Sequence, residues 1–309
     1  MNRKIDYKIN ENDTGKTVEG FLKERGYTHQ VLVRLKQTDH GILRNGIWAY
    51  TNERLCKDDL ITVQIVENEC SDNIAPVNLP LDIAYEDDDI IVINKPFDMP
   101  AHPSAGNHDN TLANALMYYY GSQNKPFVYR CINRLDRDTT GLTIVAKHAL
   151  AGGILGNAVA KHALAGGILG NAVAKRAIHR TYYAVCSGCT PACMRISAPI
   201  ARKDASTIER CVDFKRGENA VTDFIRIKYN PDNNLSLVKL RLLTGRTHQI
   251  RVHMKYIGFP LIGDFLYNPD YTYISRQALH SGRLVFTHPV TGQKMNLISD
   301  IPSDMKSLF

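Results

Sequence analysis

The sequence contains no apolar run of the roughly 18 residues that a membrane-spanning helix needs. Its first residues, MNRKIDYKINENDTGK, have no apolar segment of the kind found in signal peptides. No glycine-rich phosphate loop follows a predicted strand, so the common nucleotide cofactors have no recognisable binding motif. We therefore expect a soluble cytoplasmic protein that has no membrane contact and binds no nucleotide cofactor.

Cysteine is sparse, and the odd number of 7 residues argues against a disulfide framework. Cys186 and Cys189 form a C-x2-C pair followed by Cys193, which is half of a zinc site. Cys211 and His179 are the candidate fourth ligands, but a second C-x2-C pair or an H-x3-5-H pair is missing. We therefore expect loop thiols and no metal.

The composition is that of a globular chain, with 309 residues, 44% apolar and 22% charged, enough for one large domain and a small one. The formal charge of +7 is compatible with a polyanionic partner such as nucleic acid. Since many basic proteins bind no nucleic acid, this charge only modestly favours that class of partner.

Residues 1–70 are predicted to form a small α+β unit. Val18, Phe21 and Leu22 share one helical face, and a second apolar helix follows at 31–35. Arg44-Asn45-Gly46 is a hairpin-type turn, and 61–65 alternates as a strand does. Two short basic helices before a hairpin resemble an S4-type RNA-binding domain, and the alternative is a basic face that only keeps the unit soluble. The candidate RNA-binding cations of this unit are Lys16, Arg25, Arg34 and Lys36.

A linker is predicted at 71–80, and a second domain at 81–309. Two strands flank the acidic turn at 87–89, and Asn94-Lys95-Pro96 ends the second one. Further strands are predicted within the ranges 142–146, 182–185, 221–227, 235–242 and 283–286. Many short strands with few helices between them favour an α+β fold with a mixed, mainly antiparallel sheet.

One segment is repeated: AKHALAGGILGNAV stands at 146–159 and again at 160–173. Its apolar residues have helical spacing, and two identical copies indicate a tandem duplication and exclude a solenoid. We expect the surrounding strands to pair normally, the excess to loop out as a poorly packed excursion between about 147 and 176, and either copy to fit the helix almost equally well.

A charged stretch precedes the strand at 142–146, in the sequence CINRLDRDTTGLTIVAK. Together with YEDDDIIVINKP, with TGRTHQIRVHMKYIGFPLIGDFLY at 244–267 and with LHSGRLVFTHPVTG at 279–292, it resembles the RluA/RluD family of ribosomal RNA pseudouridine synthases. The resemblance covers essentially all of 81–309, with these motifs in the family's order. It implies a monomeric enzyme that isomerises uridine within RNA, most closely large-subunit ribosomal RNA, without a metal or organic cofactor.

The resemblance also implies roles for individual residues. Asp136 matches the catalytic aspartate, which could act as a nucleophile or as a base. Arg251 matches the arginine that pairs with it, and Tyr182 matches the tyrosine that packs against the flipped base. Arg134 matches the residue that fills the gap left by that base. Lys95 and Arg246 are further candidates for contact with RNA, Lys95 as a structural charge or one near a phosphate.

Two departures and two alternatives accompany the resemblance. Asn133 stands where many relatives have histidine, and the duplication lies between Asp136 and Tyr182.

An RNA-binding protein without turnover is the main alternative because of that duplication. An RNA-directed glycosidase is the other, and it would need a second carboxylate such as Asp138, which we expect to be left in the turn. His248 and His253 lack the spacing of a helical metal pair and are expected in the core or facing RNA.

Overall fold

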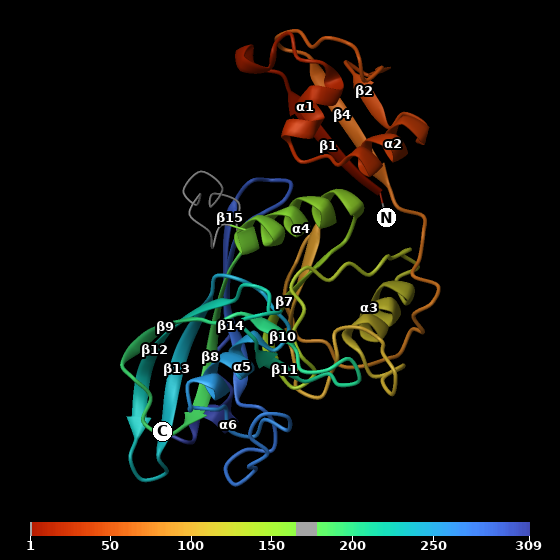
Figure 1. Ribbon diagram of the computed structural model, residues 1–309. Coiled ribbons are helices and arrows are strands. Elements are labelled where there is room, and N and C mark those ends of the chain that lie inside the picture. Colours follow the sequence, from red (N-terminus) through yellow and green to blue (C-terminus); the bar gives the residue numbers. More distant parts are fainter. Residues whose placement is uncertain (1, 165–177) are drawn as a thin grey trace.

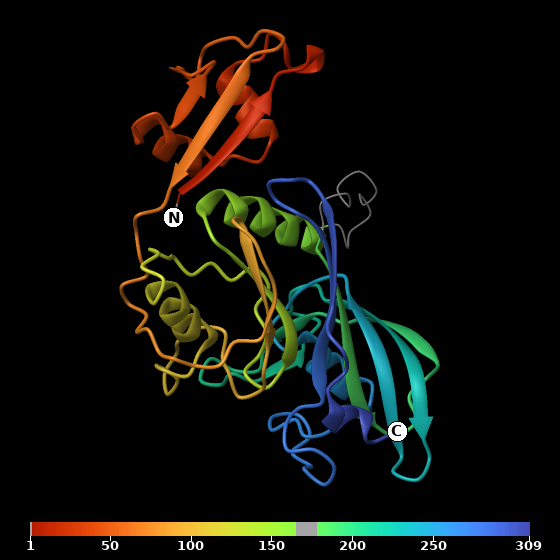
Figure 2. The same cartoon turned by 180° about the vertical axis from the view of Figure 1, so that it is seen from behind.

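The computed structural model describes residues 2–164 and 178–309. An N-terminal unit stands at one end of the molecule, above helix α4 of a larger unit (Figures 1 and 2). The elements of the N-terminal unit are β1 (Asn2–Lys8), η1 (Glu11–Asp13), α1 (Val18–Glu24), α2 (His29–Gln37), β2 (Ile42–Arg44), β3 (Ile47–Trp48) and β4 (Leu60–Val66). Its strands form one antiparallel sheet in the order β1-β4-β2-β3.

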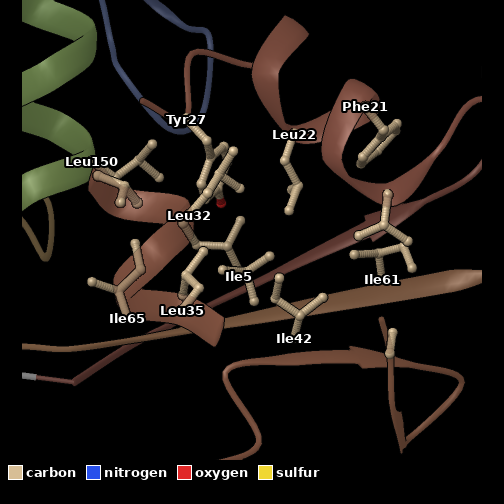
Figure 3. Packing of buried hydrophobic residues seen from close by; sticks show 14 of the residues in the cluster. Ile5, Phe21, Leu22, Tyr27, Leu32, Leu35, Ile42, Ile61, Ile65 and Leu150 are labelled. Atoms are coloured by element: carbon tan, nitrogen blue, oxygen red, sulfur yellow. The ribbon is translucent and has the colours of Figure 1, made fainter. Parts of the chain in front are cut away.

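The two helices predicted for this unit are confirmed. Threonine caps each of them, since the side chains of Thr17 and Thr28 accept hydrogen bonds from backbone N–H groups in the first turn. Their apolar faces pack on the sheet, as Figure 3 shows for Leu22 and Leu32. The predicted hairpin is also present, and its turn residues have the positive φ that such a turn requires.

Residues 71–80 contain no helix or strand and lead into the larger unit. Its main sheet has nine strands within the described residues, in the order β5-β6-β7-β14-β8-β13-β12-β9, with β15 paired to β14. The bounds are β5 (Ile83–Glu86), β6 (Ile90–Lys95), β7 (Thr140–Ala146), β8 (His179–Ser187), β9 (Cys193–Ser197), β12 (Val221–Asn230), β13 (Leu235–Leu242), β14 (Leu279–Thr287) and β15 (Lys294–Ile298). A separate hairpin pairs β10 (Ile200–Arg202) with β11 (Arg210–Val212).

The predicted strands and the mixed, mainly antiparallel sheet are confirmed. Among the described pairs only β7 and β14 run parallel, and they touch through Thr140 and Gly141. Gly141 has φ +104°, and a Cβ atom there would lie 2.3 Å from the Ser281 carbonyl oxygen. Glycine is therefore required for the two halves of the sheet to join.

Helices cover both faces of this sheet. The helices are α3 (Leu112–Gly121), α4 (Ala149–Leu164), α5 (Gln249–Tyr256) and α6 (Ser303–Lys306). Neighbouring residues of β6 point to opposite faces, so Ile91 packs with α3 whereas Ile90 packs with α4. The remaining long helix, α5, packs on β8, β12 and β13. None of the described helices has the length and apolarity needed to cross a membrane.

Helix α4 lies within the duplicated segment. It begins in the first copy and continues across the junction into the second, and Leu150, Leu155 and Ala158 of the first copy are buried. The first copy thus takes the place of the helix, as expected of one of the two copies, and the excess falls largely on 165–177, which lie outside the described residues. His148 of the first copy bonds to Asp89, and His162 holds the same place in the second copy, so the near-equivalence of the two copies stays a prediction.

The N-terminal unit contacts the larger one at this helix. Leu150 joins the core of the small unit beside Tyr27 and Leu32 (Figure 3). Glu67 accepts hydrogen bonds from the backbone N–H of Ala149 at 2.7 Å and from the Arg130 guanidinium at 2.7 Å. An apolar contact and charged contacts therefore join the two units.

Candidate active site

The loop 131–139 carries the predicted catalytic aspartate and is attached to the sheet by side chains. Asn133 is buried, donates to the Leu142 carbonyl at 3.1 Å and accepts from the Ile144 N–H at 2.8 Å. Lys95, at the end of β6, donates to the Arg137 carbonyl at 2.9 Å. These contacts fix the backbone on both sides of Asp136.

Asp136 is held by a buried pair of charged side chains. Arg251 on α5 is 2% exposed, and its Nη1 donates to Asp136 Oδ2 at 2.9 Å. The other edge of the guanidinium binds Asp264, with both distances at 2.7 Å, and Asp264 also accepts the backbone N–H groups of Leu266 and Tyr267. Burial by itself lowers the pKa of Arg251, but the two carboxylates outweigh burial and raise it, so the guanidinium stays charged. Oδ2 is thus the anchored oxygen of Asp136, and no hydrogen bond from the described residues reaches Oδ1.

His248 faces the same carboxylate oxygen, with Nε2 3.8 Å from Asp136 Oδ2. Its Nδ1 lies 2.9 Å from the Tyr267 hydroxyl, which in turn accepts the Arg210 backbone N–H. Nδ1 therefore accepts the hydroxyl proton and leaves Nε2–H facing the carboxylate. Burial lowers the pKa of His248, more than Asp136 raises it, which favours this neutral form.

Tyr182 lies on β8 in the pocket that contains Asp136. The pocket is lined by Arg134, Leu135, Asp136, Thr139, Arg180, Tyr182, Leu242, Gly245, Arg246, His248, Gln249, Ile250, Arg251 and Leu279. Tyr182 is 5% exposed, and burial raises the pKa of its hydroxyl. Tyr183 packs on the opposite side of the sheet, as strand alternation predicts. The structure thus brings Asp136, Tyr182 and Arg251 together despite the duplication between the first two.

The other predicted RNA-contacting residues have different surroundings. Arg134 is exposed at the edge of the pocket, and its side chain makes no ion pair or hydrogen bond with the described residues. Arg246 lines the pocket and pairs with Glu218. In the N-terminal unit, Lys16 pairs with Asp13 and Glu24, Arg25 with Asp13, Arg34 with Glu69, and Lys36 with Glu19.

Of the two roles expected for Lys95, the structure favours the structural charge over contact with RNA. Lys95 is 1% exposed and donates to the carbonyl oxygens of Pro96 and Arg137. Burial lowers the pKa of its ammonium to about 7, against the raising effect of Asp138 and Asp136. Lys95 therefore holds loop 131–139 in place through the Arg137 carbonyl.

The cysteine pattern does not gather ligands in the described residues. Cys186 is buried in β8, whereas Cys189 and Cys193 are exposed. The one group whose ligand atoms could meet around an ion in this part of the chain is Asp87, Asp89 and His288. His288 Nε2 already lies 2.8 Å from Asp87, and its Nδ1 accepts backbone N–H groups, so the imidazole has no lone pair left for a metal.

Sequence reasoning missed three residues of the site. Asp264 could have been found as a lone acid inside the apolar stretch PLIGDFLY, since a buried carboxylate needs a cationic partner. Asn133 was treated as a minor departure, although it fastens the loop. Arg180 is buried in the pocket beside Tyr182, and its spacing of two residues in a strand was the available signal.

The known proteins that are similar to this chain belong to one family. The pattern of the family described as RNA pseudouridylate synthase matches residues 89–256. RNA pseudouridine synthase YjbO of Bacillus subtilis is 37% identical over 95% of this chain and 98% of its own length. Ribosomal large subunit pseudouridine synthase D of Escherichia coli K12 is 34% identical over 97% of this chain and 92% of its own length.

Among solved structures, human RNA Pseudouridylate Synthase Domain Containing 1 has the same fold. Its TM-score is 0.56 at 24% identity, over 72% of this chain and 83% of that one. The family pattern covers more than half of the chain, and the curated relatives match nearly its whole length. The chain therefore belongs to the RNA pseudouridylate synthase family.

Proposed function

We propose that this chain isomerises uridine to pseudouridine in RNA and that Asp136 is the reacting group. The C1′–N1 bond breaks, the base turns, and C5 bonds to C1′; the proton lost from C5 passes to solvent and N1 gains one. The main support is the position of Asp136, with Oδ2 fixed by a buried arginine and no hydrogen bond to Oδ1 from the part of the chain that the structure describes. Both a nucleophilic route and an elimination begin with such a carboxylate.

The other predicted residues take supporting roles in this proposal. Tyr182 packs against the flipped base, and Arg251 holds Oδ2 of Asp136 in position. Arg134, exposed and without a partner among the described residues, occupies the space in the RNA stack that the uridine leaves. No cofactor takes part.

The two alternative functions have less support. Binding without turnover was motivated by the duplication, yet Asp136 and Tyr182 line one pocket. A glycosidase needs a pair of carboxylates, and Asp136 is the one acidic residue among the described residues that line this pocket. Asp138 lines the adjoining cavity with Asp136, but there its carboxylate pairs with Arg137.

The experiment is tritium release from RNA labelled at C5 of uridine. Asp136→Asn keeps the shape of the side chain and removes its charge, so we expect the rate to fall at least about 1,000-fold. Asp138→Asn is the matched control and should keep near-normal activity. Turnover that survives Asp136→Asn contradicts the proposed function, and free uracil among the products indicates the glycosidase.

We further propose large-subunit ribosomal RNA as the substrate, with the N-terminal unit as an S4-like RNA-binding domain. The support is the named substrate of the Escherichia coli relative. For the domain, the support is the helix pair followed by a hairpin, with Arg34 and Lys36 exposed on α2. Mapping pseudouridine in ribosomal RNA from cells with and without the gene tests the substrate. A change confined to transfer RNA contradicts it.

A further inference from the structure

Arg180 is a buried cation of the active-site pocket without an acidic partner. It lies on β8, is 8% exposed and lines the pocket with Tyr182. Among the described residues no carboxylate lies within ion-pair distance of its guanidinium, and 165–177 contain no aspartate or glutamate. An isolated buried charge is costly, so a protein keeps one only where something compensates for it.

The other arginines of this pocket differ from Arg180 in their surroundings. Arg251 is buried but binds both Asp136 and Asp264. Arg246 pairs with Glu218, and Arg134 is exposed to water. Arg180 therefore combines burial with an uncompensated charge, a combination not found at the other three.

The pocket also leaves space and a free donor at this guanidinium. Its Nε is buried and has no hydrogen-bond partner in the described part of the chain. A Cβ atom on Gly245 would lie 3.1 Å from Nη2, so glycine at that position makes room for the head group. The hydroxyl of Tyr182, which lines the same pocket, stays neutral because burial raises its pKa, so it does not balance the charge of Arg180.

We propose that Arg180 binds a phosphate of the target nucleotide once the uridine has entered the pocket. This inference rests on the proposed function and adds a phosphate subsite to it. A phosphate carries a full negative charge and several acceptor oxygens, which match both the charge and the free N–H of a guanidinium. A uracil carbonyl offers only a partial charge before the glycosidic bond breaks. Since Arg180 and Tyr182 are two residues apart on one strand, the subsite lies beside the base.

The first test measures ligand binding without turnover, by thermal shift with uridine and with uridine monophosphates. The 5′- and 3′-monophosphates should raise the melting temperature of the protein more than uridine does. Arg180→Met should remove this difference and Arg180→Lys should retain part of it. Equal shifts with uridine and both monophosphates in the unmodified protein overturn the proposal.

The same variants separate a ligand role from a structural one. Because Arg180→Met removes an unpaired buried charge, the free protein should melt at the same temperature or higher. RNA affinity should nevertheless fall by about 10- to 100-fold. The slope of log affinity against log salt concentration should become less steep by about 0.7, because one phosphate contact is lost. A lower melting temperature with unchanged affinity contradicts the phosphate subsite.

Kinetics distinguish binding from chemistry. A phosphate contact made equally in the ground and transition states raises KM in Arg180→Met and leaves kcat near normal. A fall in kcat with unchanged KM overturns the phosphate assignment and points to charge developing on the base. The affinity measurement is repeated in Asp136→Asn protein, where turnover does not interfere. If Asp136→Asn stays active, the proposed function fails, while the monophosphate shifts still decide the subsite.

Discussion

The N-terminal unit and the active-site pocket are both rich in basic side chains, but their charges are balanced differently. Each candidate RNA-binding cation of the N-terminal unit has a carboxylate partner within the unit. In the pocket, Arg134 and Arg180 have none among the described residues. A phosphate must displace an existing partner at the first set of cations but not at the second. We therefore expect the pocket to contribute more RNA affinity per cation.

The largest expected effect comes from breaking the balanced pair inside the pocket. Asp264→Asn leaves the buried guanidinium of Arg251 with Asp136 as its one charged partner. We expect the free energy of unfolding to fall by about 3–5 kcal/mol, and kcat to fall about 100-fold because the anchor of Asp136 shifts. Chemical denaturation measures the free energy of unfolding, and tritium release measures kcat. Asp270→Asn, in an exposed turn of the same loop, is the control and should change neither. Unaltered kcat in a folded Asp264→Asn protein would contradict this role of Asp264.

An effect of intermediate size compares an unpaired cation of the pocket with paired cations of the N-terminal unit. Arg134→Ala removes an exposed, unpaired cation and should lower kcat/KM by about 10- to 100-fold, since a charge-assisted contact to RNA is lost. The double variant Arg34→Ala/Lys36→Ala removes exposed, paired cations and should cost less than about fivefold, because each loss also frees a carboxylate partner from its ion pair. Steady-state kinetics on one RNA compare them. A larger loss in the double variant would reverse the comparison and favour the N-terminal unit as the main RNA anchor.

The smallest effect concerns Lys95, a cation that is buried and bound to carbonyl groups. Its pKa is lowered to about 7 in the folded protein, whereas an unfolded lysine titrates near 10.4. Between these values the unfolded chain binds more protons, so the contribution of Lys95 makes stability rise with pH. Lys95→Met removes this contribution. Above pH 7 the free energy of unfolding of the variant should therefore rise less steeply with pH, by up to about 1.4 kcal/mol per pH unit. Urea denaturation at several pH values measures it, and parallel curves for the two proteins would refute it.

Secondary structure could be predicted from the sequence where one local pattern determines it. Alternation predicted the strand at 61–65, which lies in β4, and apolar residues with helical spacing predicted α1 and α2. The family motifs located Asp136, Tyr182 and Arg251, which meet in one pocket. These predictions depend on neighbours in the chain or on a motif that spans only a few residues.

Contacts between distant segments could not be predicted in the same way. The burial of Lys95 depends on the Arg137 carbonyl, 42 residues further along the chain. The missing partner of Arg180 is a property of the whole pocket, and no local pattern records an absence. The contact at the start of helix α4 joins His148 to Asp89, which are 59 residues apart. The sequence shows which charges exist, and only the fold shows which of them are paired.

The attachment of loop 131–139 has a thermodynamic consequence for the reaction. Asn133 on one side and Lys95 on the other fix the backbone around Asp136 before any RNA arrives. The conformational entropy of ordering this loop is therefore lost during folding, not during substrate binding or bond breaking. Loosening either contact should make the activation entropy more negative and leave the activation enthalpy comparatively unchanged. The polar groups buried beneath the loop thus serve the reaction rate without touching the substrate.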